Sequence, residues 1–290
     1  IAARAGVSAG VVKGLVKVGA MQELALPVDA PFDEPNPDHP GMELTEGQED
    51  AAKELVAQMQ IQDFSVSLLD GVTGSGKTEV YFEAVAEALR QGGQVLILVP
   101  EIALTQAGMT RFEKRFGVKP AEWHSAAGDA PRRRVWREVA QGRAKLVVGA
   151  RSALYLPFSD LKLIVVDEEH DTSYKQEEGV IYNARDMSIV RAKLSGHAVI
   201  LASATPSLES LHNARSGKFA HIVLPERPGA AVLPDIGLVD LKENQPEKGD
   251  FLSAPLIEAV RAGLEQGDQS MLYLNRRGYA PLIICRSCGE

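Results

Sequence analysis

A glycine-rich loop at residues 71–78 carries the residue types that bind a triphosphate. Its sequence, G-V-T-G-S-G-K-T, fits the phosphate-loop template G-x-x-x-x-G-K-S/T and lies between an apolar run and a helix pattern. The loop glycines let the backbone take positive φ and approach an anion without an intervening Cβ. Successive N–H groups and the positive end of the following helix then face the phosphates. The predicted nucleotide-binding residues of the loop are Gly71, Gly74, Ser75, Gly76, Lys77 and Thr78.

Two carboxylates follow a second apolar run and would complete this site. The mostly apolar residues 161–166 are followed directly by Asp167 and Glu168. We expect Lys77 to bridge the β- and γ-phosphates, and Thr78 and Asp167 to hold Mg²⁺. Glu168 would orient and deprotonate the attacking water. The pattern predicts a nucleoside triphosphatase, and an acidic helix start after a buried strand is the alternative.

Two polar segments beside these runs have both a local and a functional interpretation. Thr45 and Gln48 form the capping box of a helix that runs to about residue 59. In nucleotide-driven motors, a glutamine just upstream of the phosphate loop also pairs with adenine, and both roles are compatible. Residues 202–206, A-S-A-T-P, are by themselves a turn with an N-cap. After a D-E-x-H sequence, Ser203 and Thr205 are typical of the element that links hydrolysis to movement.

Short apolar runs that alternate with helical segments must position these residues. Continuous apolar strands separated by helices indicate an α/β fold, a parallel sheet with helices on both faces. In such folds, ligands lie at the carboxyl ends of the strands, where polar residues follow each run here. The expected strands are residues 95–99, 146–149, 163–167 and 199–203, and residues 105–116 are mostly helical.

Composition indicates a soluble globular chain. Apolar residues make up 45% and charged residues 24% of its 290 residues. No run approaches the roughly 18 apolar residues of a membrane span, and no signal peptide is evident. Cys285 and Cys288 are too few for a disulfide framework, which favours a reducing cytoplasm. Neither Ile1 nor Glu290 resembles a natural terminus, so we expect a piece of a longer protein.

The N-terminal part contains a helix-turn-helix pattern and an acidic segment. Apolar residues at helical spacing between Val11 and Val18, an N-cap at Ser8 and a terminating Gly19 predict a helix after a tight turn. A DNA-contacting winged helix and a small packing domain are equally open interpretations. Prolines and acids over residues 29–44 predict an extended linker. Acids between residues 29 and 50 account for the whole net charge of −8.

The order of the motifs resembles the primosomal protein N′ family of superfamily 2 replication-restart DNA helicases. The segments are G-V-T-G-S-G-K-T, V-P-E-I-A-L-T, D-E-E-H, S-A-T-P-S-L-E-S, L-N-R-R-G-Y-A-P and C-x-x-C-G, and they cover essentially the whole chain. The resemblance implies a winged-helix piece at residues 1–28 and the acidic linker at 29–44. It further implies a RecA-like, ATP-binding helicase lobe at 45–230 and the start of a second RecA-like lobe at 231–290.

The resemblance also implies residues that couple hydrolysis to DNA. His170 would relay between the Mg²⁺ site and the element of Ser203 and Thr205. Residues 171–185 resemble the family's aromatic-rich loop, and tyrosines interleaved with basic residues suit base stacking beside phosphates; an ordinary surface loop is the alternative. The arginines of residues 132–137, beside Trp136, favour a solvated helix face over a DNA backbone contact. The expected DNA-binding residues are Arg151, Tyr174, Lys175, Tyr182 and Arg185.

The C-terminal residues hold half of a metal site. Cys285 and Cys288 have the spacing of one zinc knuckle, and a structural zinc ion needs more ligands than these two. The resemblance implies Zn²⁺ in the full-length parent protein, and a redox pair is the alternative. For Arg276 and Arg277, contact with nucleotide or DNA and a structural salt bridge are both open.

By resemblance we expect a cytoplasmic, ATP- and Mg²⁺-dependent 3′→5′ DNA helicase that acts at stalled or abandoned replication forks and assembles the primosome. Its expected partners are single-stranded and forked DNA, single-stranded-DNA-binding protein and other replication-restart proteins, with no membrane. The family's arginine finger would lie beyond Glu290, so we expect this chain to bind nucleotide but hydrolyse it feebly. A translocase that never separates strands and a protein-binding platform with a vestigial ATP site are the alternatives.

Overall fold

The computed structural model describes residues 6–22, 31–61, 63–100, 106–227, 235–246, 250 and 252–273. The chain divides into two units, residues 1–231 and 232–290, which are described separately. Helix α2 (Ala9–Lys17) follows Ser8 as N-cap, and Gly19 with φ of 73° lies just beyond its end, as the sequence predicts. The first helix of the predicted helix-turn-helix falls on residues 1–5, outside the described residues.

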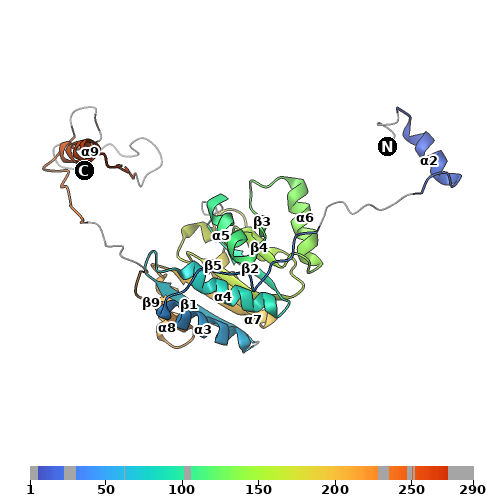
Figure 1. Ribbon diagram of the computed structural model, residues 1–290, viewed down its shortest axis with the longest axis horizontal. Coiled ribbons are helices and arrows are strands. Elements are labelled where there is room, and N and C mark those ends of the chain that lie inside the picture. The colour runs from blue at the N-terminus through green and yellow to red at the C-terminus, as the bar shows by residue number, and fades with distance from the viewer. Residues whose placement is uncertain are drawn as a thin grey trace. The chain divides into compact units, whose positions relative to one another are not determined.

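A seven-stranded, wholly parallel sheet forms the centre of the first unit (Figure 1). Its spatial order is β3-β4-β2-β5-β8-β1-β9. The four expected strands are confirmed, whereas β3 and β9 carry no long apolar run and were not predicted. The strands are β1 (Ser65–Gly71), β2 (Gln94–Leu98), β3 (Ala121–Trp123), β4 (Leu146–Gly149), β5 (Leu161–Asp167), β8 (Ala198–Ser203) and β9 (Ala220–Leu224).

Helices cover both faces of the sheet, which confirms the predicted α/β fold. One core lies beneath α3 (Glu46–Gln60), α4 (Lys77–Arg90) and α5 (Gln106–Phe116). The other lies beneath α6 (Asp129–Ala140), α7 (Ala184–Ser195) and α8 (Leu208–Arg215). Residues 95–98 of strand β2 are all apolar because both faces of the strand are buried: Val95 and Ile97 enter the first core, and Leu96 and Leu98 the second.

The order of strands in space differs from their order in the chain, and this brings three loops together. β8 lies between β5 and β1, with Asp167 beside Ala202 and Asp70 beside Ser203. Because the strands are parallel, the segments that follow β1, β5 and β8 leave the sheet at the same edge. The phosphate loop, the D-E-E-H segment and the S-A-T-P segment therefore meet there.

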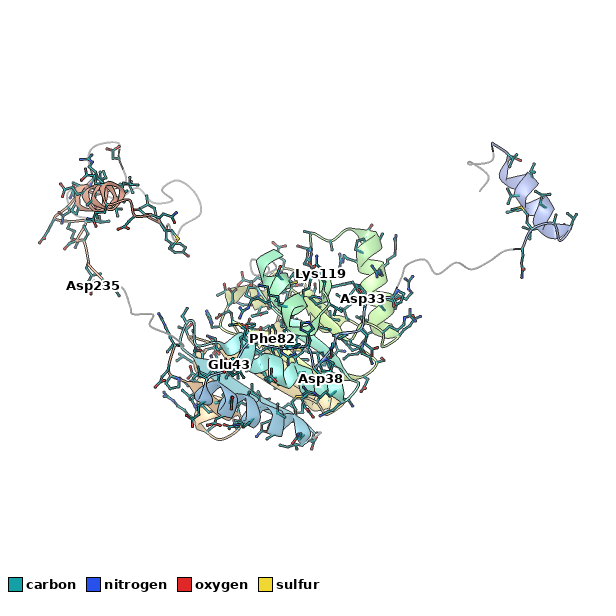
Figure 2. All side chains as sticks on the ribbon, viewed as in Figure 1. Asp33, Asp38, Glu43, Phe82, Lys119 and Asp235 are labelled. Carbon is teal, nitrogen blue, oxygen red and sulfur yellow. The ribbon has the colours of Figure 1, made fainter. Side chains whose placement is uncertain are left out.

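The acidic segment of residues 31–44 forms no helix or strand, contains a turn at residues 36–39, and packs against the helices of the first unit. Arg115 on α5 donates from Nη1 to the carbonyls of Pro37 (3.2 Å) and His39 (2.9 Å). Asp38 pairs with Arg90 over 2.9 Å. Asp33, Asp38 and Glu43 lie along this segment at the surface (Figure 2), while the labelled Phe82 lies in the core beneath it. Over these residues the acidic segment is therefore held to α4 and α5.

The second unit contains helix α9 (Ala254–Glu265), preceded by Ser253 and followed by Gly267 with φ of 81°, as the sequence predicts. The predicted strand at residues 271–274 is wrong over residues 271–273, which form no strand. Arg276, Arg277, Cys285 and Cys288, like Glu101 and its neighbours to residue 105, lie outside the described residues. No helix in the described part of the chain is long and apolar enough to cross a membrane.

Candidate nucleotide-binding site

The phosphate loop between β1 and α4 requires its glycines for conformation and for space. Gly74 and Gly76 have φ of 80° and 84°, a region that side chains disfavour. A Cβ at Gly76 would collide with Nε2 of Gln48, and one at Gly71 would lie 2.5 Å from Oγ of Ser75. The loop can therefore close tightly around a group held by its N–H donors.

Lys77 is buried at the start of α4 and bends back onto the loop. Its Nζ donates to the carbonyls of Gly71 (2.8 Å) and Val72 (3.5 Å). Both partners are neutral, and an anionic phosphate oxygen is a stronger acceptor for an ammonium group. The ammonium thus lies at the loop in a position to exchange a carbonyl for a phosphate.

Gln48 joins helix α3 to the phosphate loop. Its Oε1 accepts from the backbone N–H of Thr45 over 2.9 Å, so the predicted capping box is confirmed. Its Nε2 donates to the carbonyl of Ser75 over 2.8 Å, and the side chain is buried. The amide is therefore shared between the helix start and the loop, and adenine pairing by Gln48 stays a prediction.

A cavity of about 550 Å³ opens beside the loop, between the start of α3 and the segment that follows β9. Thr45, Gln48 and Asp50 line one side, and Leu224 and Arg227 the other. A Cβ built on Gly74 would lie 4.0 Å from Cδ of Arg227, so the Arg227 side chain lies next to the loop. The sequence did not indicate Arg227, since it follows a strand that no long apolar run marks.

Asp167 closes β5 with both carboxylate oxygens hydrogen-bonded. Oδ1 accepts from the N–H of Glu168 (3.0 Å), and Oδ2 from the hydroxyl of Tyr81 (3.1 Å). The Thr78 side chain interacts with that same hydroxyl. Burial, and then the charge of Glu168, raise the pKa of Asp167. Thr78 and Asp167 thus both interact with the hydroxyl of Tyr81. The sequence analysis did not identify Tyr81.

These residues fit a magnesium ion that is shared with a nucleotide. Among the described residues, no three or more His, Cys, Asp or Glu side chains gather to form a metal cage. Magnesium is typically bound through one or two carboxylates together with substrate phosphates and water. A single carboxylate, Asp167, beside the hydroxyl of Thr78 matches that arrangement.

Glu168 has an unusual backbone conformation. Its φ of 49° lies in the left-handed region, and among the described residues it is the only non-glycine there. Such conformations persist where surrounding structure imposes them, and they cluster at functional sites. The side chain remains 44% exposed, so its carboxylate is available to water and to a ligand.

His170 bridges the D-E-E-H segment to the S-A-T-P segment. Its Nδ1 lies 2.7 Å from Oγ of Ser203 and 3.6 Å from Oε2 of Glu168. Oγ of Ser203 also accepts from the N–H of Thr205 over 3.0 Å. A continuous set of contacts therefore joins Glu168 to the turn after β8.

Glu169, which the sequence analysis left without a role, is the buried centre of a polar cluster. It accepts from the N–H of Ser207 (2.6 Å), the hydroxyl of Ser210 (3.0 Å) and Nη1 of Arg185 (3.2 Å). Ser207 is the N-cap of α8, and Arg185 lies in the first turn of α7. Glu169 thus connects the end of β5 to two helices that cover the same face of the sheet.

Two of the residues predicted to bind DNA lie in the interior, and that prediction is wrong for them. Tyr174 is 1% exposed, and its hydroxyl lies 2.5 Å from the carbonyl oxygen of Asp167 and 3.0 Å from that of Leu98, either of which can accept its one hydrogen. The Arg185 side chain is 9% exposed and paired with Glu169. Base stacking needs a ring face that is open to solvent, and phosphate binding needs an accessible guanidinium. Burial leaves neither the ring of Tyr174 nor the guanidinium of Arg185 accessible. Alternation of aromatic and basic residues does not distinguish a buried loop from an exposed one.

The remaining predicted DNA contacts surround a short hairpin of β6 (Lys175–Gln176) and β7 (Tyr182–Asn183). Arg151 Nη1 donates to the carbonyls of Ser173 (3.0 Å) and Lys175 (2.9 Å). The ring of Tyr182 meets that of Tyr155 edge-on at 5.2 Å. Lys175 is exposed and pairs with Glu177. Arg151, Lys175 and Tyr182 stay predictions.

The arginines of α6 do not form a uniformly solvated face, which corrects the favoured interpretation. The guanidinium of Arg132 lies 4.7 Å from the ring centre of Trp123, and that of Arg134 lies 4.3 Å from that of Phe32. Such cation–π contacts hold the helix against the sheet edge and the acidic segment. Arg133 and Trp136 are exposed.

Comparisons with known proteins agree with this geometry. The family model described as DEAD/DEAH box helicase matches residues 45–214. The chain is 47% identical over 223 residues to the Replication restart protein PriA of Rickettsia conorii, across 77% of this chain and 34% of the relative. It is 37% identical over 289 residues to the Bacillus subtilis protein of that name, across 97% of this chain and 35% of the relative.

Among solved structures, DUF1998 helicase MrfA aligns with a TM-score of 0.52 at 21% identity, across 81% of this chain and 36% of that chain. At that identity the likeness shows the fold alone, a RecA-like α/β arrangement. The chain spans about a third of the length of the curated relatives above.

Proposed function

The chain belongs to the DEAD/DEAH box helicase family, and from this premise we propose that it is the ATP-binding lobe of an ATP-dependent DNA helicase that acts in replication restart. The observation that carries the proposal is the meeting of three segments at one sheet edge, after β1, β5 and β8. The resemblance to the primosomal family is confirmed by relatives named Replication restart protein PriA. Activity, substrates and partners of the whole protein are part of the proposal.

The triphosphate binds on the loop of residues 71–78. Backbone N–H groups and the N-terminus of α4 surround the phosphates, and Lys77 exchanges its carbonyl partners for β- and γ-phosphate oxygens. Thr78 and Asp167 hold Mg²⁺, which neutralises charge on the phosphates when bound. Gln48, already in contact with the loop, pairs with adenine.

Hydrolysis depends on Glu168, whose exposed carboxylate orients and deprotonates the attacking water. His170 and Ser203 then carry the change at the phosphates to Thr205 and the start of α8. Since Glu169 also ties α7 and α8 to this segment, movement of residues 167–170 would be transmitted to two helices.

DNA is the proposed substrate, with strand separation in the 3′→5′ direction at stalled or abandoned forks. Support comes from the similarity to proteins named for replication restart. Single-stranded-DNA-binding protein and primosome proteins are the proposed partners, and the cytoplasm is the proposed location. Zn²⁺ would be held in the parent protein by Cys285 and Cys288 together with further ligands.

ATP hydrolysis with and without single-stranded DNA tests the proposal. The 290 residues should bind ATP but turn it over at least about a thousand-fold more slowly than the DNA-stimulated full-length protein, because we assign the arginine finger to a complete second helicase lobe. Lys77→Ala should abolish binding in both. Absence of Mg²⁺-dependent nucleotide binding by the wild-type chain would refute the ATP-site assignment, and turnover like that of the full-length protein would refute the need for a finger from the second lobe.

Arg227→Ala should weaken nucleotide binding by about 1–2 kcal/mol, or roughly 5- to 30-fold. The reason is that Arg227 faces Gln48 across the cavity beside the loop, where a guanidinium can stack on a base. Titration with a fluorescent ADP measures the effect. Arg215→Ala, at an exposed arginine at the end of α8, is the matched control and should bind like the wild type. Equal affinities for the two variants would exclude Arg227 from the site.

A further inference from the structure

Tyr81 is a buried tyrosine on α4 whose hydroxyl reaches across to the end of β5. The hydroxyl donates to Oδ2 of Asp167 over 3.1 Å, and the side chain of Thr78 interacts with it. Its ring packs edge-on against Phe82 with 5.3 Å between centroids, and the exposed fraction of the residue is 1%. Because the ring is held by the core, the hydroxyl is fixed against the Asp167 carboxylate.

The carboxylate of Asp167 is fixed through both oxygens. Glu168 N–H binds Oδ1 and Tyr81 binds Oδ2, so rotation of the carboxylate would break at least one of these hydrogen bonds. Each oxygen has a further lone pair, which leaves the group able to reach a cation.

We propose that Tyr81 is a positioning residue, which holds the Asp167 carboxylate in the orientation that allows Asp167 and Thr78 to share one divalent cation with the nucleotide. The inference rests on the proposed function and adds a residue to it. Groups that hydrogen-bond to metal ligands orient them, and their loss typically reduces metal affinity about 10- to 100-fold. The glutamate next to Asp167 cannot supply this restraint alone, since its N–H binds only one of the two oxygens.

Tyr81→Phe tests the inference, because it removes only the hydroxyl. Binding of a fluorescent ADP to the present chain is measured in EDTA and across a Mg²⁺ titration. We expect the Mg²⁺ concentration at half-maximal effect to rise about 10-fold or more, with affinity in EDTA unchanged. Tyr155→Phe, at an exposed tyrosine outside the site, is the matched control and should leave the titration unchanged.

The outcomes separate this inference from the proposed function. A wild-type titration without any Mg²⁺ effect would overturn both. If Mg²⁺ strengthens ADP binding by the wild type, and Tyr81→Phe has the same Mg²⁺ concentration at half-maximal effect, only the role of Tyr81 would be overturned. Loss of affinity in EDTA as well would assign the tyrosine to the fold and also overturn it. In an Asp167→Asn background, the hydroxyl should no longer alter the Mg²⁺ dependence, and a full remaining effect would contradict the proposed contact.

Discussion

Glu168→Gln in the full-length protein should lower DNA-stimulated ATP turnover by about 10²- to 10⁴-fold while nucleotide binding is retained. The amide keeps the size of the side chain but cannot accept a proton from water. The carboxylate lies 3.6 Å from His170 and remains partly exposed, so the substitution removes charge and basicity without filling or emptying a core. Steady-state hydrolysis and titration with a fluorescent ADP measure the two quantities.

Glu113→Gln is the matched control for that experiment. Glu113 is an exposed glutamate on α5, outside the proposed nucleotide and DNA contacts. Its change should leave turnover close to that of the wild type. Hydrolysis that survives Glu168→Gln would mean that another group activates water, or that turnover arises elsewhere, and the assigned role of Glu168 would be withdrawn.

Glu169→Ala should destabilise the first unit by about 3–5 kcal/mol. The substitution leaves the buried guanidinium of Arg185 without its buried counter-charge and removes the acceptor for the N–H of Ser207 and the hydroxyl of Ser210. An uncompensated buried charge costs far more than a lost surface pair. Denaturant unfolding of the present chain measures the free energy of unfolding.

Glu49→Ala supplies the comparison, because Glu49 forms an exposed pair with Lys53 on α3. Its loss should change the free energy of unfolding by less than about 1 kcal/mol. Glu169→Gln keeps a hydrogen-bond acceptor but removes the charge, so its loss of unfolding free energy should lie between those of Glu169→Ala and Glu49→Ala. Similar losses of unfolding free energy for Glu169→Ala and Glu49→Ala would show that the polar cluster around Glu169 contributes little to stability.

The local order of residues was sufficient to predict the loop, the strands with long apolar runs and the capping box. Glycines at the spacing of a phosphate loop, apolar runs of strand length and Thr45 three residues before Gln48 are all patterns within a few residues. The same holds for Ser253 and Gly267 at the ends of α9. Strands β3 and β9 were missed because no long apolar run marks them.

Only the tertiary structure decided which segments meet and which side chains face solvent. Nothing in the local pattern shows that β8 lies between β5 and β1, which is what places His170 against Ser203. Tyr81 was assigned no role for the same reason, since its partner Asp167 is far away in the chain. Tyr174 and Arg185 have residue types typical of a nucleic-acid surface, yet they are buried. Burial depends on contacts between distant segments, and residue type and spacing alone do not determine those contacts.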